Sequence, residues 1–130
     1  MFSLLLVDDS NITRRYVKNE MLSILKYDDI VVTEWSNGKE ACVACQTHKV
    51  DLMLIDLKMP EMDGYDVLEC LKKHGMSIKT IVLSGDIQPG VEEIVKSSGA
   101  IGLLKKPFNR EQVAKVLKQN GFQVRECPVC

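Results

Sequence analysis

The chain lacks an excess of charge of either sign and a long apolar run, and its first residues do not have the pattern expected of a secretory leader. Its 17 Lys and Arg nearly balance 18 Asp and Glu, for a net charge of −1 over 130 residues. This balance gives no electrostatic reason to expect a nucleic-acid or membrane surface. No apolar run approaches the roughly 18 residues of a transmembrane helix, and residues 1–7 offer neither a basic region nor a cleavage site. We therefore expect a cytoplasmic protein that binds neither nucleic acid nor membrane.

Five cysteines are present, and an odd number without a leader favours reduced thiols over a disulfide framework. Four of them form two C-x-x-C pairs, Cys42/Cys45 and Cys127/Cys130, and two such pairs can make a zinc site. We expect the first pair on the apolar face of a helix, where free cysteine acts as a small core residue. The second pair follows the last expected helix. It is either an inert end, which we favour, or a redox or metal-binding appendage.

Short apolar runs alternate with amphipathic stretches along the chain. Strands are expected at 2–7, 30–35, 51–55, 79–83 and 100–104, and helices at 11–25, 38–48, from about 65, at 90–97 and at 109–119. In the first helix, Ile12, Tyr16, Met21 or Leu22, and Leu25 supply the apolar spacing, and residues 9–11 supply capping chemistry. Five repeats of strand then helix predict a doubly wound α/β fold, with a parallel sheet covered on both faces. With no internal linker, we expect one domain over 1–120 and a short tail over 121–130.

Polar residues with reactive groups stand where the expected strands end, and ligands of open α/β sheets bind beyond those carboxyl ends. In chain order these residues are Asp8 and Asp9, Asp56, Ser84, and Lys105 and Lys106. Each alone is ordinary, as a helix cap, a solvated loop acid, a turn residue or a lysine before proline. Their joint arrangement at the ends of four strands favours a functional site.

Three carboxylates in one cleft repel one another and require a compensating proton or cation. Oxygen ligands with room for water suit Mg²⁺. Phosphoryl transfer depends mostly on positioning and charge neutralisation, which a metal, a lysine and a hydroxyl supply together. An aspartate can then act as the nucleophile and form an acyl phosphate.

Four segments resemble the receiver domains of two-component response regulators: Leu6–Ser10, Leu54–Gly64, Val82–Gly85 and Lys105–Phe108. The order and spacing match from about Phe2 to Gln119. The resemblance implies a flavodoxin-like five-stranded sheet of order 2-1-3-4-5 with five helices. It also implies that Asp56 accepts a phosphoryl group from a histidine kinase or phosphotransfer protein, with slow autodephosphorylation rather than enzymatic turnover.

The resemblance also implies roles for the other residues at the strand ends. Mg²⁺ would be held by Asp8, Asp9, Asp56 and the backbone carbonyl of Lys58. Ser84 would hydrogen-bond the phosphoryl group, and Lys106 rather than Lys105 would pair with it. Phosphorylation would then bias a two-state surface around the fourth helix, fifth strand and fifth helix.

Two features depart from the family pattern or extend it. Leu103 stands three residues before Lys106, where many receiver domains have a Tyr or Phe that reports the switch, so the signal would travel through the backbone or partner binding. Lys58 and Asp86, each two residues beyond Asp56 and Ser84, resemble positions that tune phosphoryl lifetime in this family. A lysine and an aspartate there are able to pair across the mouth of the site.

No output domain fits after residue 120, so we expect a stand-alone regulator that acts through a partner protein. Candidate partners are a flagellar motor component in chemotaxis, a phosphatase or a phosphorelay intermediate. The alternative is a phosphorylation-independent adaptor, against which the mutually repelling acids argue. A dehalogenase-type phosphatase would have an acid where Lys58 stands, and a flavodoxin-like electron carrier would have a phosphate-binding loop where Asp8 and Asp9 stand. The cognate kinase, the output partner and the oligomeric state stay open.

Overall fold

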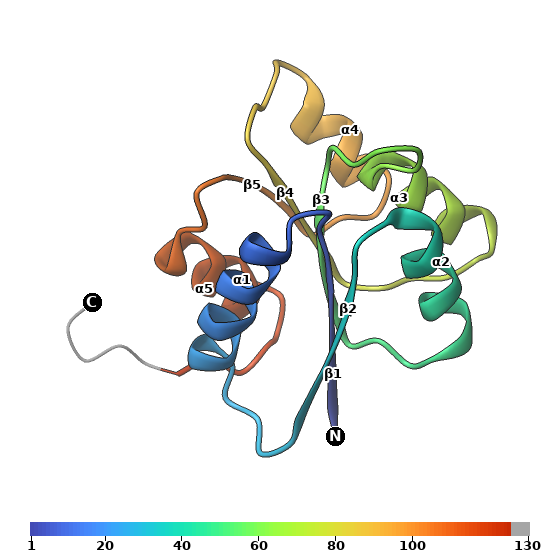
Figure 1. Cartoon of the computed structure of the whole chain (residues 1–130). Helices are drawn as coiled ribbons and strands as arrows, with labels where there is room; N and C mark the ends of the chain where they lie inside the picture. The colour runs from blue at the N-terminus through green and yellow to red at the C-terminus, as the bar shows by residue number, and fades with distance from the viewer. Residues whose placement is uncertain (126–130) are drawn as a thin grey trace.

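The computed structural model describes residues 1–125, in which five strands alternate with five helices (Figure 1). The strands are β1 (Phe2–Val7), β2 (Ile30–Trp35), β3 (Leu52–Asp56), β4 (Thr80–Ser84) and β5 (Gly102–Lys105). The helices are α1 (Asn11–Ile24), α2 (Gly38–Thr47), α3 (Gly64–Lys73), α4 (Val91–Ser97) and α5 (Arg110–Gln119). The expected elements are all present, with small shifts at their ends.

The strands form one parallel sheet in the order β2-β1-β3-β4-β5. The chain first adds β2 on one side of β1 and then crosses back to add β3 on the other. The strand order therefore reverses between β1 and β3, which is where open α/β sheets bind their ligands. This arrangement confirms the expected doubly wound fold.

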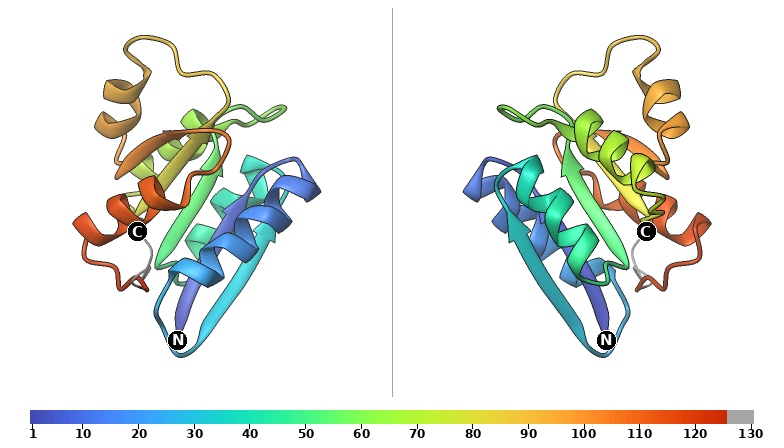
Figure 2. Two further views of the ribbon diagram at one scale, coloured as in Figure 1. Left: turned by 90° about the vertical axis from the view of Figure 1, so that its left-hand side faces the viewer. Right: turned by 90° about the vertical axis from the view of Figure 1, so that its right-hand side faces the viewer.

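Helices cover both faces of the sheet. In Figure 2, one view shows α1 and α5 in front of the strands, and the opposite view shows α2 and α3 there. Successive residues of a strand point to opposite faces of the sheet. In β1, Leu5 and Val7 therefore pack with α2 and α3, while Leu4 and Leu6 pack with α1 and α5. The central strands β1, β3 and β4 are mostly apolar and, except at Ser3, buried because both of their faces are covered.

Side-chain caps begin four of the helices. Ser10, Asn37 and Asn109 accept hydrogen bonds from backbone N–H groups in the first turns of α1, α2 and α5. Asp63 and Asp66 form a reciprocal capping box at α3. The Ser10 cap at α1 confirms the capping chemistry expected at residues 9–11.

The buried face of α1 differs from the expected one. Its buried residues are Val17, Met21 and Ile24, whereas Ile12 is 84% and Tyr16 46% exposed. The prediction from apolar spacing was wrong in the first half of the helix. Ile12 and Tyr16 fit the helical period as well as the residues that are buried, so spacing alone does not distinguish the two faces. The sheet buries the side defined by Val17 and Met21.

Cys42 and Cys70 form a disulfide that joins α2 to α3. The expectation of reduced thiols was therefore wrong for this pair, and Cys42 is not a free core cysteine. Its partner lies 28 residues away, beyond the reach of any local spacing rule. Cys45 does behave as expected: it is a free, buried thiol, and burial raises its pKa to about 11.

Residues after α5 continue against the core. Phe122 packs edge-on to Phe2, and Val124 forms a β-bridge with Leu25. The division at residue 120 into domain and tail stays a prediction. Cys127 and Cys130 lie outside the described residues. Within the described chain, no helix is both long and apolar enough to span a bilayer.

Candidate functional site

The residues expected at the strand ends meet at one edge of the sheet. Asp8 directly follows β1, Asp56 and Ser84 end β3 and β4, and Lys106 directly follows β5. Parallel strands bring these ends together because all of them run in the same direction. Neighbouring strands at this edge are also joined by the Lys106 backbone N–H, which donates to the Ser84 carbonyl at 2.8 Å.

Lys106 links two of the carboxylates. Its Nζ lies 3.0 Å from Asp8 Oδ2 and 3.2 Å from Asp56 Oδ2. Both carboxylates are buried, and the lysine side chain is 27% exposed. The ammonium therefore reaches from the solvent edge into the acidic cleft.

Three carboxylates stand close enough to share one cation. Asp8, Asp9 and Asp56 each offer an oxygen, and these atoms all lie within 4.8 Å of one another. Asp9 is exposed while the other two are buried, so the group opens to solvent on one side. Carboxylate oxygens at an accessible edge are the donors that Mg²⁺ takes together with water.

The charges of the buried acids Asp8 and Asp56 are not fully balanced by Lys106, and the pKa values of Asp56 and Lys106 reflect this. Burial raises the pKa of Asp56 above its usual value, and the Asp8 charge adds to this, although Lys106 partly offsets both. For Lys106, burial alone would lower the pKa, but the hydrogen bonds and charges of Asp8 and Asp56 outweigh it and raise the pKa overall. One lysine thus does not compensate two buried acids fully.

Local backbone geometry fixes the Asp56 carboxylate. The Lys58 N–H donates to Asp56 Oδ1 at 3.3 Å, and the Gly64 N–H donates to the Leu57 carbonyl at 2.9 Å. A Cβ on Gly64 would lie 2.9 Å from the Asp56 carbonyl oxygen and 3.0 Å from Leu57 Cα. The segment from Asp56 to Gly64 therefore folds tightly back on the end of β3, which only glycine at its last position allows.

Ser84 is buried at the end of β4, and its hydroxyl is engaged locally. It donates to the Asp86 backbone carbonyl at 2.9 Å, and the Asp86 N–H donates to Ser84 Oγ at 3.3 Å. The hydroxyl therefore ties the start of the β4–α4 loop to the strand end.

Other expected positions stand apart from the site. Lys105 is exposed and Lys106 turns inward, as expected for neighbouring residues at a strand end. Leu103 is buried in the core on the α4 side of the sheet. Among the described residues, the ion pairs include none between Lys58 and Asp86, and the Asp86 carboxylate accepts from Gln88 instead.

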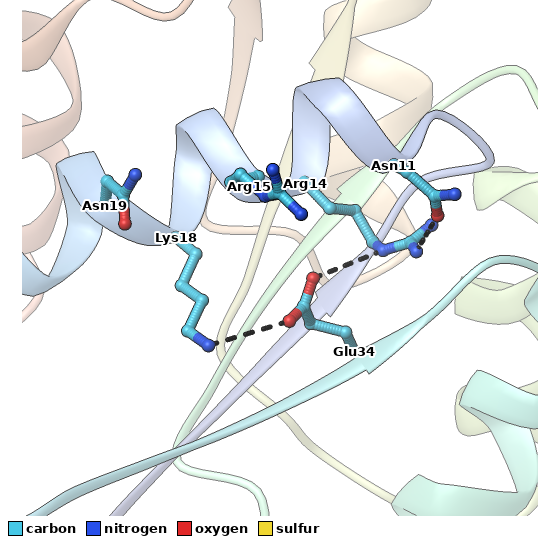
Figure 3. Close-up of a pocket in the computed structure, with 6 residues that line it drawn as sticks. All are labelled: Asn11, Arg14, Arg15, Lys18, Asn19 and Glu34. Carbon is cyan, nitrogen blue, oxygen red and sulfur yellow. Dashed lines mark hydrogen bonds and ion pairs between the residues drawn. The ribbon is translucent and has the colours of Figure 1, made fainter.

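Arg14 supports the site and was missed in the sequence. Its guanidinium donates to the Asp8 backbone carbonyl and to the Asn11 side chain, and it also pairs with Glu34 on β2. Figure 3 shows the polar recess beside it, in which Lys18 reaches the same Glu34 at 3.8 Å. An arginine one turn into the helix that follows an acidic strand end was the available signal, but its partner on β2 is visible only in the fold.

Comparisons with known proteins agree with this geometry. Residues 4–124 match the model of the response regulator receiver domain. The chain is 35% identical over 120 residues to the chemotaxis protein CheY of Listeria monocytogenes, covering 92% of this chain and 98% of that protein. It is 31% identical to the response regulator SaeR of Staphylococcus aureus, but there it spans 96% of this chain and 52% of the relative.

Solved structures give the same result. The chemotaxis protein CheY4 of Vibrio cholerae matches with a TM-score of 0.77 and 27% identity, covering 92% of this chain and 98% of that one. The receiver domain of the Francisella response regulator 1452 matches with a TM-score of 0.78 and 25% identity, covering 92% and 99%. With fold, strand order and acidic edge in agreement, the chain belongs to the family of response regulator receiver domains, the signalling modules of two-component systems.

Proposed function

We propose that this receiver domain accepts a phosphoryl group on Asp56 from a histidine kinase or a phosphotransfer protein. One observation carries the proposal: Lys106 Nζ lies 3.2 Å from Asp56 at an edge where three carboxylates share a space 4.8 Å across. A structural acid at a strand end has no need of two further acids beside it, because their repulsion costs stability. A site for a cation and an incoming phosphate does need them.

The residues present fit Mg²⁺. Asp8, Asp9 and Asp56 would hold it, together with the backbone carbonyl of Lys58. The ion would supply positive charge that neutralises both the acids and the phosphoryl oxygens. The raised pKa of Asp56 supports this fit, because it indicates that the residues alone leave negative charge uncompensated.

The chemical step is a displacement at phosphorus. An Asp56 carboxylate oxygen forms a bond to the phosphorus atom while the P–N bond of the donor phosphohistidine breaks. The imidazole leaves with the bonding electrons and takes up a proton. Lys106, already in contact with Asp56, balances the charge that the phosphoryl oxygens bring to the cleft.

The signal would then pass through Ser84. Its hydroxyl now donates to the Asp86 carbonyl, and a phosphoryl oxygen on Asp56 would offer a stronger, charged acceptor. Turning toward the phosphate releases the Asp86 carbonyl and lets the β4–α4 loop move. We propose that this motion alters the face formed by α4, β5 and α5, where a partner protein binds, without the aromatic switch that Leu103 replaces.

The CheY relatives match this chain over nearly their whole length, which supports a stand-alone regulator. On this proposal the protein works in the cytoplasm with its phosphodonor and acts through protein partners, as in chemotaxis or a phosphorelay. The runner-up is an adaptor whose partner binding does not depend on phosphorylation.

The test is phosphorylation by a small donor. The protein is incubated with acetyl phosphate and Mg²⁺ and its intact mass is measured. We expect a gain of one phosphoryl group that Asp56→Asn or EDTA abolishes. Glu61→Gln, which alters an exposed acid in the same loop, should be phosphorylated like the wild type. No mass gain in the wild type would replace this proposal with the adaptor function.

A further inference from the structure

The disulfide between Cys42 and Cys70 connects two helices that pack side by side on one face of the sheet (Figure 1). The Cα atoms of the pair are 6.8 Å apart. Cys45 lies one turn along the same helix and remains a free thiol, buried against Met53. Helix α2 thus carries one disulfide-bonded cysteine and one free cysteine. The packing of α3 determines which of them forms the disulfide, because it places Cys70 beside Cys42.

The surroundings of the pair differ from those of a buried core thiol. Cys42 is buried, but Cys70 is partly exposed and faces polar groups. The Gln46 side-chain amide donates to Cys42 Sγ at 3.3 Å and to Cys70 Sγ at 3.7 Å. A small reagent can therefore reach Cys70 from solvent.

His74 adds a hydrogen-bond donor beside Cys70, the partly exposed member of the pair. Its Nδ1 lies 2.8 Å from the Cys70 carbonyl oxygen, so this nitrogen carries the hydrogen. The same nitrogen is 3.7 Å from Cys70 Sγ. When the Cys70 thiolate forms, the His74 ring can turn this N–H from the carbonyl toward the sulfur and stabilise its negative charge, and the thiolate is the form in which a cysteine attacks a disulfide.

We propose that Cys42 and Cys70 form a reversible redox site that closes and opens by exchange with low-molecular-weight disulfides and thiols of the glutathione type. On closure, the Cys70 thiolate attacks one sulfur of the small disulfide, and one small thiol leaves with the proton that Cys70 gave up. The Cys42 thiolate then attacks Cys70 Sγ in the mixed disulfide and releases the second small thiol. The protein pair loses two electrons, and the small disulfide gains them.

Formation of the Cys42–Cys70 disulfide would join α2 to α3 covalently, and both helices begin beside the loop that follows β3. A Cβ on Gly38, at the start of α2, would lie 2.4 Å from the Met62 carbonyl oxygen, so α2 abuts the loop that precedes α3. A Cβ on Gly64, at the start of α3, would lie 2.9 Å from the Asp56 carbonyl oxygen, so α3 abuts the end of β3. A link between α2 and α3 therefore restrains the segment 57–63, whether or not Asp56 is ever phosphorylated.

The first test maps the bond. The full-length protein is equilibrated with oxidised or reduced glutathione, alkylated and digested with trypsin. Trypsin places Cys42 and Cys45 in peptide 40–49, Cys70 in peptide 59–72 and the two C-terminal cysteines in peptide 126–130. We expect peptides 40–49 and 59–72 to be linked through Cys42 in oxidised glutathione and to separate in an excess of reduced glutathione. A link that never forms, or one that survives excess reduced glutathione, overturns the proposal.

The second test measures what the bond does. Closing a loop of this length should raise the melting temperature of the wild type by about 10 °C over the reduced protein. Cys70→Ser replaces a partly exposed residue and should show no redox-dependent shift, and neither should Cys42→Ala. A shift that persists in both variants, or its absence in the wild type, contradicts the proposal. Neither readout involves phosphate, so failure here leaves the proposed role of Asp56 intact.

Discussion

Lys106 and Asp56 are in contact through a 3.2 Å ion pair, although 50 residues of sequence separate them. The same ammonium lies 3.0 Å from Asp8. The cation that a phosphoryl group would need thus already stands beside the proposed acceptor, where the two acids hold it. This pair links the fold, which brings the ends of β3 and β5 to one edge, to the chemistry proposed for that edge.

Replacing Lys106 by methionine should slow phosphoryl transfer from acetyl phosphate to Asp56 by about a hundredfold to a thousandfold. The methionine fills similar space but supplies no charge to the phosphoryl oxygens, and loss of one well-placed electrostatic donor costs about this factor. The rate is measured by intact mass against time. Lys105→Met removes the neighbouring, exposed lysine and should transfer at the wild-type rate; equal slowing in the two variants would contradict the role given to Lys106.

Replacing Asp56 by asparagine should stabilise the protein in EDTA, so that it unfolds at a higher urea concentration than the wild type. Burial and the Asp8 charge raise the pKa of Asp56, so keeping it ionised at neutral pH destabilises the folded state. Asparagine removes that cost and leaves Lys106 to pair with Asp8 alone. Urea unfolding measures the difference.

Adding Mg²⁺ tests whether a cation relieves the repulsion between the acids of the site. The ion should stabilise the wild type more than Asp56→Asn, because the variant has lost one ligand, so the gap between the two proteins narrows or reverses. The exposed acid Glu61 serves as the control, since Glu61→Gln should follow the wild type in both conditions. A variant less stable than the wild type in EDTA would show that the acidic cluster is not under electrostatic tension.

Stability at alkaline pH should depend on Cys45. Its pKa is raised from 9.0 to about 11 by burial, so between these values the unfolded chain releases a proton that the folded chain keeps. Below pH 9 the two states bind this proton equally, and above it folding stability falls with rising pH until about pH 11.

Comparison with Cys45→Ala isolates this effect from other titrating groups. The stability of the wild type relative to the variant should decline between pH 9 and about pH 10.5, measured by urea unfolding with a reductant present. The reductant keeps the other cysteines in the same state in both proteins. A constant difference across this range would mean that the thiol is not buried as the fold places it.

Replacing Gly64 by alanine should destabilise the domain by about 1–3 kcal/mol. The new methyl group would lie 2.9 Å from the Asp56 carbonyl oxygen, so either α3 or the end of β3 must shift. Gly85→Ala provides the matched control, since a Cβ there meets nothing within 4 Å. Thermal unfolding of both variants measures the contrast, and equal melting temperatures would refute the close approach at Gly64.

The strands and helices, their order and the residues at the strand ends could be predicted from the amino-acid sequence. The alternation of apolar runs with amphipathic stretches predicts five strand–helix units, because hydrophobic periodicity is a local property. A parallel sheet then places the residues after each strand at one edge, so the sequence predicts that Asp8, Asp9, Asp56, Ser84 and one of Lys105 and Lys106 meet there. The resemblance to receiver domains selects Lys106 of the two lysines. The cap at Ser10 is similarly readable, since it depends on neighbouring residues alone.

Which helix faces are buried and which distant residues come into contact depends on how the elements pack in the fold. Ile12 and Tyr16 fit the apolar period of α1 but face outward, because the sheet packs against Val17 and Met21. Cys42 pairs with Cys70 rather than remaining a core thiol, because the packing of α2 on α3 sets the distance between them. Such contacts join residues far apart in sequence, and no local pattern encodes the relative placement of two helices on a sheet.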